Sequence, residues 1–271
     1  MHHNQNISFL SNKSLFLKDL CGTLFFMEIA IFAQHATKIY GKVKAVDDLS
    51  FTVQRGEMVG LLGPNGAGKT TVIHMLLGLL APTSGNIRVL GLSPLKDRPL
   101  LAQKINFSSA YVQLPSNLKI IENMKIFAGL YGISRPLEKI KFLLNLFNMD
   151  HLAKRLTGAL SAGEKTRLNL CKALLNDPEV LLLDEPTASL DPEMALNVRN
   201  VLQKIQKERH LSVIYTSHNM VEVQEMCDRV LFLNHGREVL QGKPHEILKE
   251  LQYKTLDEVF IAVARRKEGA T

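Results

Sequence analysis

Short apolar runs alternate with amphipathic stretches along most of this chain. Runs that are typical of buried strands lie at residues 27–33, 49–53, 58–62, 86–90, 180–183 and 212–215. Helical periodicity occupies residues 70–80 and 192–208 between them. Strands that alternate with helices predict an α/β fold with a parallel sheet at its centre.

Two regions depart from this alternation. Residues 118–176 have a mostly helical period and no convincing strand, which predicts an inserted helical subdomain over about residues 114–178. The runs at 230–233 and 238–240 flank the turn His235-Gly236, and this arrangement predicts two strands that pair with each other.

The N-terminal residues differ from the rest of the chain. Residues 1–26 are first polar and rich in asparagine, then irregularly apolar, without turn residues or a clear period. We therefore expect a poorly structured extension over residues 1–26 and one folded domain over residues 27–271. A further hypothesis is that translation starts at Met27, where the first strand pattern begins. The intact mass of the natively expressed protein tests it, because a mass that includes residue 1 excludes the late start.

Composition narrows the class of protein only a little. The chain is 46% hydrophobic and 22% charged, which is ordinary for a globular protein. Cys21, Cys171 and Cys227 lie far apart, so neither a disulfide framework nor a zinc site is indicated. A net charge of +7 suits a nucleic-acid partner, an anionic membrane surface or a plain solvated surface. No apolar run reaches the ~18 residues of a membrane span, so any membrane role requires a partner that crosses the bilayer.

The strongest chemical signal follows the apolar run at 58–62 and opens the helical stretch at 70–80. The pattern Gly, four residues, Gly-Lys-Thr is that of a P-loop, in which glycines let backbone N–H groups point at phosphates. The Lys69 ammonium can reach the β- and γ-phosphates, and the Thr70 hydroxyl can bind Mg²⁺. A chance glycine-rich turn would not need this strand-then-helix context. The residues expected to bind the nucleoside triphosphate are Gly63, Pro64, Asn65, Gly66, Ala67, Gly68, Lys69, Thr70 and Thr71.

A second element ends the apolar run at 180–183. Asp184 and Glu185 follow it directly, so both carboxylates lie at the carboxyl end of a buried strand, where parallel sheets place ligand groups. Asp184 is expected to hold Mg²⁺, and Glu185 to act as the general base or to orient the attacking water. Together with the P-loop, the pair predicts a Mg²⁺-dependent nucleoside triphosphatase.

Residues 160–164, Leu-Ser-Ala-Gly-Glu, begin a helix that runs to about Asn176. The segment resembles the signature motif of ATP-binding cassette (ABC) proteins, usually Leu-Ser-Gly-Gly-Gln. In that family the residues at Ser161 and Gly163 contact the γ-phosphate bound by the opposite protomer. Glu164 departs from the family pattern by replacing an amide with a charge. A serine hydroxyl at a helix N-terminus also suits an anion, and a bare helix cap is the alternative.

The resemblance extends in order along residues 27–260 and assigns further roles. Asp191, in Ser189-Leu190-Asp191, matches the D-loop, and His218 matches the switch histidine near the γ-phosphate. Tyr40 matches the aromatic residue that stacks on adenine. Gln113 matches the glutamine that senses the γ-phosphate and binds Mg²⁺. Gln103 is a poorer alternative, because it precedes the strand-like run at 110–112.

The resemblance implies a P-loop NTPase fold: a RecA-like core, the helical subdomain, and an antiparallel patch near residues 28–53. It implies that two cassettes, as a homodimer or a pseudo-dimer, sandwich two ATP molecules with Mg²⁺. Closure of this dimer would power a membrane-spanning permease that docks near Gln113 and residues 115–131. The expected location is the cytoplasm, peripheral on the inner face of the plasma membrane.

The kind of ABC protein is less constrained. Tyr131-Gly132-Ile133 and the tail at residues 255–260 resemble the ATPases of ABC-2-type exporters. The alternative is an ABC ATPase that acts on nucleic acid or the ribosome, but the chain lacks the long coiled coil or the second cassette of such members. No direct nucleic-acid contact is therefore expected. A P-loop kinase or GTPase would have no use for residues 160–164 or for His218.

Overall fold

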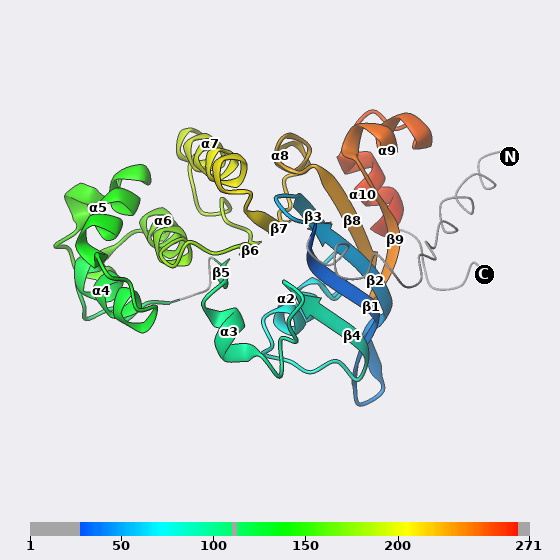
Figure 1. Ribbon diagram of the computed structural model, residues 1–271. Coiled ribbons are helices and arrows are strands. Elements are labelled where there is room, and N and C mark those ends of the chain that lie inside the picture. The colour runs from blue at the N-terminus through cyan, green and yellow to red at the C-terminus, as the bar shows by residue number, and fades with distance from the viewer. Residues whose placement is uncertain (1–27, 110–112, 265–271) are drawn as a thin grey trace, which may run out of the picture.

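The structure, a computed structural model, describes residues 28–109 and 113–264 of the chain. Its strands and helices follow one another as Figure 1 shows. The strands are β1 (Ile29–Tyr40), β2 (Val43–Gln54), β3 (Met58–Leu62), β4 (Ser84–Val89), β5 (Ile105–Ser109), β6 (Val180–Asp184), β7 (Ser212–Thr216), β8 (Arg229–Asn234) and β9 (Arg237–Gly242). The α-helices are α2 (Lys69–Leu76), α3 (Arg98–Ala102), α4 (Ile120–Leu130), α5 (Pro136–Leu146), α6 (Ala162–Ala173), α7 (Pro192–Arg209), α8 (Met220–Met226), α9 (Pro244–Leu251) and α10 (Leu256–Ala264). Two 3₁₀ turns, η1 (Asp150–Leu152) and η2 (Thr157–Ala159), precede α6.

The strands form two sheets. The larger has the order β5-β6-β7-β3-β8-β9 and is parallel except at β9, which pairs with β8 in antiparallel fashion. The smaller has the order β2-β1-β4 and is antiparallel throughout. These sheets confirm the predicted α/β core, the antiparallel patch and the paired strands around His235-Gly236.

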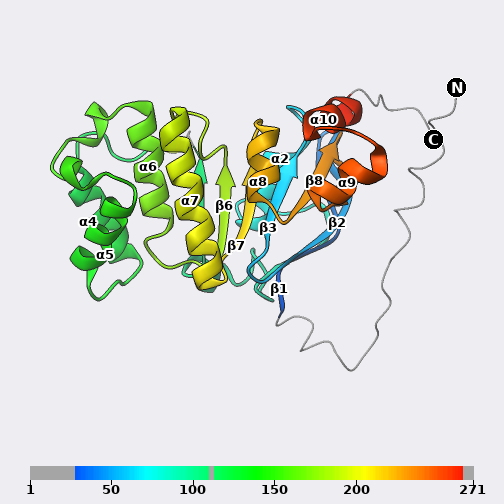
Figure 2. The same cartoon turned by 90° about the horizontal axis from the view of Figure 1, so that it is seen from above.

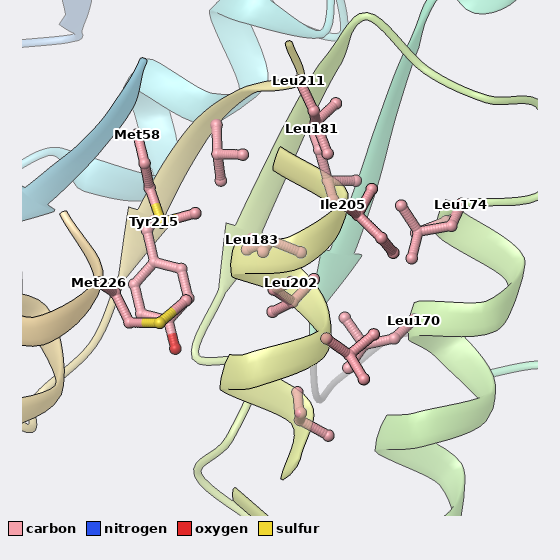
Figure 3. Packing of buried hydrophobic residues seen from close by; sticks show 14 of the residues in the cluster. Met58, Leu170, Leu174, Leu181, Leu183, Leu202, Ile205, Leu211, Tyr215 and Met226 are labelled. Carbon is pink, nitrogen blue, oxygen red and sulfur yellow. The ribbon is translucent and has the colours of Figure 1, made fainter. Parts of the chain in front are cut away.

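Side chains of the large sheet alternate between two hydrophobic clusters, because successive residues of a strand point to opposite faces. On β3, Met58 and Leu62 belong to the cluster that also holds buried side chains of α6, α7 and α8, whereas Val59 and Leu61 belong to the cluster shared with α2 and the small sheet. All four side chains are at most 1% exposed. Figure 3 shows Met58 in the first cluster together with Tyr215 and Met226. The large sheet is therefore covered on both faces, which explains why its strands read as continuous apolar runs.

Helices α4, α5 and α6 gather at one end of the molecule, beyond the edge strand β5, as both views show (Figures 1 and 2). The small sheet lies toward the opposite end. Apolar side chains such as Met124 of α4, Leu143 of α5 and Leu170 of α6 are fully buried. They share one cluster with the large sheet, so the helices pack against the core without a break in apolar contact.

Several boundaries differ from the sequence predictions. The helix expected over 70–80 ends at Leu76, because Gly78 takes a left-handed φ of 66° and turns the chain. Strand β2 begins at Val43, before the expected 49–53, because it pairs with β1 along its length. Strand β5 was not expected, since Asn106, Ser108 and Ser109 interrupt its apolar pattern.

Some predictions fall on residues that the structure does not describe. They are the N-terminal extension at 1–26, the start at Met27, Cys21 and the strand-like run at 110–112. Among the described residues, Cys171 and Cys227 are free and buried, and burial raises the pKa of both thiols. No helix within the described ranges has the length and apolar character needed to cross a bilayer.

Candidate functional site

Three neighbouring strands of the large sheet end at the same edge and deliver the candidate residues. Strand β3 leads into the P-loop, β6 ends at Asp184, and β7 leads to His218. These strands are parallel and adjacent in the order β6-β7-β3. Segments far apart in sequence therefore meet at the carboxyl edge of the sheet, where α/β proteins bind ligands.

The P-loop connects β3 to α2 and leaves the start of this helix bare. Gly68 is the N-cap of α2, with a left-handed φ of 104°, and no side chain caps the helix. No acidic residue occupies the first turn either. Free backbone N–H groups and the helix dipole together favour a bound anion, as a P-loop requires.

Two glycines of the P-loop are required by close backbone contacts. A Cβ at Gly63 would lie 2.2 Å from the Leu233 carbonyl oxygen, and a Cβ at Gly68 would lie 2.4 Å from that of Ala45. Gly66, by contrast, has open space around it. Strands β8 and β2 thus press on the loop from outside, and this packing fixes its shape.

The side chain of Lys69 folds back over the loop. Its ammonium donates hydrogen bonds to the carbonyl oxygens of Gly63 (2.5 Å) and Pro64 (3.0 Å). Burial lowers the pKa of Lys69, while the nearby charges of Glu185 and Asp184 act in the opposite direction. A cation therefore already lies between the P-loop and the two carboxylates.

The carboxylate pair at the end of β6 is held by Thr216 of β7. The Thr216 hydroxyl donates to Asp184 Oδ1 (2.7 Å) and accepts from the Glu185 backbone N–H (3.1 Å). The Glu185 N–H also points at the Thr216 carbonyl oxygen (3.2 Å). Sequence reasoning missed Thr216, although it stands two residues before His218 in the same run.

Glu185 faces His218 across the site. The His218 Nε2 lies 3.5 Å from Glu185 Oε1, with the carboxylate side chain 20% exposed and the imidazole 56% exposed. Burial raises the pKa of Glu185 above its usual value, and Asp184 adds to this, whereas His218 and Lys69 oppose it. Glu185 also has a left-handed φ of 53°, a strained conformation for this residue type that recurs at functional sites. The geometry brings the expected base and the expected switch histidine together.

The segment expected to act as the signature motif is closed on itself. Ser161 is the N-cap of α6, and its hydroxyl accepts from the Glu164 N–H (3.2 Å). The Glu164 carboxylate accepts in return from the Ser161 N–H (2.7 Å), which forms a capping box. This backbone hydrogen bond lowers the pKa of Glu164 despite partial burial. Ser161 therefore caps α6 in this structure, and a contact with phosphate would be a second role.

Gly163 and Asp191 lie at the contact between α6 and the start of α7. A Cβ at Gly163 would lie 3.1 Å from the Ser189 carbonyl oxygen, so the small residue permits close packing. Asp191 is the N-cap of α7, where its carboxylate accepts from the Met194 N–H (3.0 Å). The Asp191 side chain therefore caps the N-terminus of α7 in this structure.

Gln113 is exposed and lies between β5 and α4. It lines a cavity of about 250 Å³ together with residues of α6 and of the segment before α7, among them Ala162, Lys165 and Ser189. The structure thus brings Gln113 and the start of α6 to one cavity. No hydrogen bond joins Gln113 to Asp184 or Thr70 in the described part of the chain, so its expected roles remain predictions.

Tyr40 ends β1 beside the turn at Gly41 and is 49% exposed. Its neighbour in β2 is Val43, close in sequence to Ala45, which contacts the P-loop at Gly68. The ring therefore stands at the end of the small sheet that adjoins the P-loop. The Lys38 ammonium lies 5.3 Å from the ring centroid, a cation–π contact that sequence reasoning did not find.

These features define the class of protein. A P-loop that follows a central strand, with two carboxylates at the end of the strand next but one, is the arrangement of a P-loop nucleoside triphosphatase. Within residues 28–109 and 113–264, no group of three or more His, Cys, Asp or Glu side chains could hold a metal ion alone.

Comparison with known proteins narrows the class to a family. The profile described as ABC transporter matches residues 46–188. The Nod factor export ATP-binding protein I of Rhizobium sp. (strain N33) is 39% identical over 226 residues, 82% of this chain and 74% of that protein. The bacitracin transport ATP-binding protein of Bacillus licheniformis is 38% identical over 224 residues, 82% and 72% of the two chains. The chain belongs to the ABC transporter family, as an ATP-binding subunit with ATPase activity.

Solved structures agree on the fold. An ATP-binding subunit of an ABC transporter superposes with a TM-score of 0.81 at 24% identity, covering 87% of this chain and all of that one. A bacterial ABC transporter cassette solved as a dimer gives a TM-score of 0.73 at 23% identity, covering 79% of this chain and 98% of that one. The ABC ATPase fold implied by the sequence is confirmed.

Proposed function

We propose that this chain is the ATPase of an ABC-2-type exporter and works as a pair of cassettes on the cytoplasmic face of the plasma membrane. Each ATP is bound by the P-loop of one copy and by Ser161 and Gly163 of the other. The names of the rhizobial relatives, which are export proteins, support export as the direction. Cassettes solved as dimers support the pairing.

The site suits a magnesium nucleotide. Mg²⁺ prefers one or two protein oxygens, completed by phosphate and water, over a cage made entirely of protein. Thr70 at the exposed start of α2 and Asp184 at the end of β6 offer such oxygens, and Gln113 is the further candidate. The Thr216 hydroxyl already orients Asp184, as outer partners of metal ligands commonly do. When bound, the ion offsets the negative charge that develops on the phosphates.

The same geometry supports the roles that we propose in hydrolysis. Glu185 accepts a proton from the attacking water, and its pKa, raised by burial, makes it a stronger base than an exposed carboxylate. His218, 3.5 Å from Glu185, orients this carboxylate and contacts the γ-phosphate. Tyr40 stacks on adenine, and Asp191 contributes to the interface between the copies. The pairing of Glu185 with His218 beside Lys69 is the observation that carries the proposal.

The transported compound contacts the membrane partner in this scheme. We propose that a membrane-spanning permease docks near Gln113 and residues 115–131. Loss of the γ-phosphate then changes the conformation of the surface to which the permease binds. The helical segment within residues 114–178 moves with the signature motif as the dimer closes. Copurification with the membrane partner, followed by stimulation of ATP hydrolysis by candidate compounds, tests this step.

The Glu185→Gln variant tests the base directly. We expect kcat for ATP hydrolysis to fall at least about 100-fold, as for loss of a general base, with ATP affinity retained. With Mg²⁺ and ATP the variant should accumulate as a dimer in size-exclusion chromatography, because hydrolysis no longer separates the copies. The exposed Glu250→Gln change is the control and should keep the parent kcat. Normal turnover by Glu185→Gln removes Glu185 from the base role, and an ATP-loaded variant that stays monomeric contradicts the sandwich.

A further inference from the structure

A buried carboxylate lies directly behind the proposed site. Glu222 of α8 is 3% exposed, the most deeply buried acidic residue in the described part of the chain. The Thr187 hydroxyl donates one bifurcated hydrogen bond to the two oxygens of Glu222 (2.7 and 2.9 Å), and the Ser217 hydroxyl donates another (3.3 Å). The Tyr215 hydroxyl also donates to it. A carboxylate is costly to bury, so this one depends on these hydroxyl donors.

The donors belong to the two segments that carry the proposed catalytic groups. Thr187 stands two residues after Glu185, and Ser217 stands directly before His218. Tyr215 precedes both Thr216, which holds Asp184, and Ser217. One carboxylate therefore ties the loop after β6 to the loop after β7 at positions next to the reacting side chains.

The start of α8 fastens the same loop from the other side of His218. The Asn219 N–H donates to the Ser217 hydroxyl (3.0 Å), and the Asn219 side chain accepts from the Glu222 N–H (3.2 Å). The residues on either side of His218 are thus bound into one network with Glu222. The exposed imidazole is carried on a backbone that is fixed at both ends.

Simple packing does not account for a carboxylate here. Burial and the adjacent Glu222 charge both raise the pKa of Tyr215, so the Tyr215 hydroxyl stays a donor. Within residues 28–109 and 113–264, no lysine, arginine or histidine forms an ion pair with Glu222. An apolar side chain would fill the same space without the desolvation penalty, but it would not join the two loops.

We propose that Glu222 is a positioning residue for ATP hydrolysis, which sets the separation and orientation of Glu185 and His218 by holding Thr187 and Ser217. The inference rests on the proposed roles of Glu185 and His218. A displacement of about 1 Å at a reacting group can cost about 100-fold in rate, so a network of this kind acts on turnover. Phosphate binding depends on the P-loop, and none of the hydrogen bonds of Glu222 involves that loop.

The first test compares Glu222→Gln with Glu225→Gln, the same chemical change one turn along α8 on an exposed side chain. We expect Glu222→Gln to lower kcat about 10-fold to 100-fold, with the KM and the Kd for ATP changed less than about twofold. Glu225→Gln should match the parent protein in all three. A parent-like kcat for Glu222→Gln overturns the inference. Equal losses in kcat and ATP affinity overturn it as well, because they indicate general damage to the fold.

A pair of variants at Thr187 decides the matter if Glu222→Gln folds poorly. Thr187→Val keeps the shape of the side chain and removes the hydroxyl, whereas Thr187→Ser keeps the hydroxyl. We expect Thr187→Val to lose kcat about 10-fold and Thr187→Ser to recover most of it, with similar melting temperatures. Equal activity of the two variants contradicts the role of the hydrogen bond.

The double variant Glu222→Gln/Glu185→Gln separates this inference from the proposed function. If Glu222 acts through the base, its removal should cost no further rate once Glu185 is absent, so the two effects are not additive. A further loss of about 10-fold or more in the double variant contradicts the inference alone. Unchanged hydrolysis by Glu185→Gln contradicts the proposed function, whatever Glu222→Gln does.

Discussion

The starts of α2 and α6 are both expected at a nucleotide, but the chain prepares them in opposite ways. Helix α2 begins at Gly68, with no side-chain cap and no acid in its first turn. Helix α6 begins at Ser161, with a complete capping box that includes the Glu164 carboxylate. The first helix end leaves its N–H groups for a ligand, whereas the second satisfies part of its own.

This difference predicts that the two helix starts bind phosphate with unequal strength. No side-chain cap has to be displaced for phosphate to reach the start of α2, so this helix end suits tight binding by one copy alone. At α6, a phosphate that approaches Ser161 competes with Glu164 for the same donors and meets a negative charge. The contact across the dimer is therefore expected to be weaker and easier to release than the contact within one copy, which suits a dimer that must reopen.

Lys69→Ala should produce the largest effect, because it removes the only cation that hydrogen bonds within the P-loop in the described residues. We expect ATP affinity to fall about 100-fold, since a charge-assisted bond to phosphate is worth about 3 kcal/mol. Isothermal titration of the full chain measures it. The exposed Lys96→Ala is the control for loss of positive charge. Unchanged affinity in Lys69→Ala would contradict the P-loop interpretation.

The variants Gly68→Ala and Gly66→Ala test how strongly backbone packing constrains the P-loop before α2. Both glycines have a positive φ, but only at Gly68 would the new Cβ meet backbone, 2.4 Å from Ala45 oxygen. We expect Gly68→Ala to lose about 3 kcal/mol of unfolding free energy and Gly66→Ala about 1 kcal/mol. Urea unfolding measures both. Equal losses would mean that φ alone, and not the contact with β2, constrains the loop.

Sequence patterns predicted the regions whose structure is determined by residues close together in the sequence. The P-loop could be found because a strand, a glycine-rich turn and a helix follow one another directly, and β6 could be found because both of its faces are apolar. Strand β5 was missed because Asn106 is buried through hydrogen bonds to Tyr131 and Asn176, which are distant in sequence. A polar residue in a strand does not reveal such partners in advance.

The residues of the candidate site likewise fall into those that the sequence predicts and those that only the structure reveals. Residue types and order pointed to Glu185 and His218, but their 3.5 Å separation depends on the register of β6 against β7, where Asp184 pairs with Thr216. The positioning groups Thr216 and Glu222 carry no motif that shows their role. Their function follows from burial and partners, and these exist only in the folded chain.

Glu164→Gln should have the smallest effect and bears directly on the comparison of the two helices. Glutamine can keep the hydrogen bond of the capping box but loses the favourable interaction of a carboxylate with the helix dipole, so stability should fall by only about 0.5 kcal/mol. Because the folded state lowers the pKa of Glu164, its charge stabilises the protein above the usual pKa near 4.5. This contribution is lost as the pH falls through the lowered value, so urea unfolding should separate parent and variant at neutral pH and less in acid.

The same change should act on the dimer in the opposite direction. Removing one negative charge beside the expected phosphate should tighten the ATP-bound dimer by about 5-fold at most, the range of an exposed charge interaction. Sedimentation of Glu164→Gln in the Glu185→Gln background measures this. Glu122→Gln is the matched control, since Glu122 accepts from the Lys119 N–H (2.8 Å) in the equivalent position of α4. It should cost similar stability and leave the dimer unchanged. If both variants leave the dimer unchanged, the Glu164 charge does not face the nucleotide. Any weaker phosphate binding at the start of α6 would then result from the hydrogen bonds of the capping box alone.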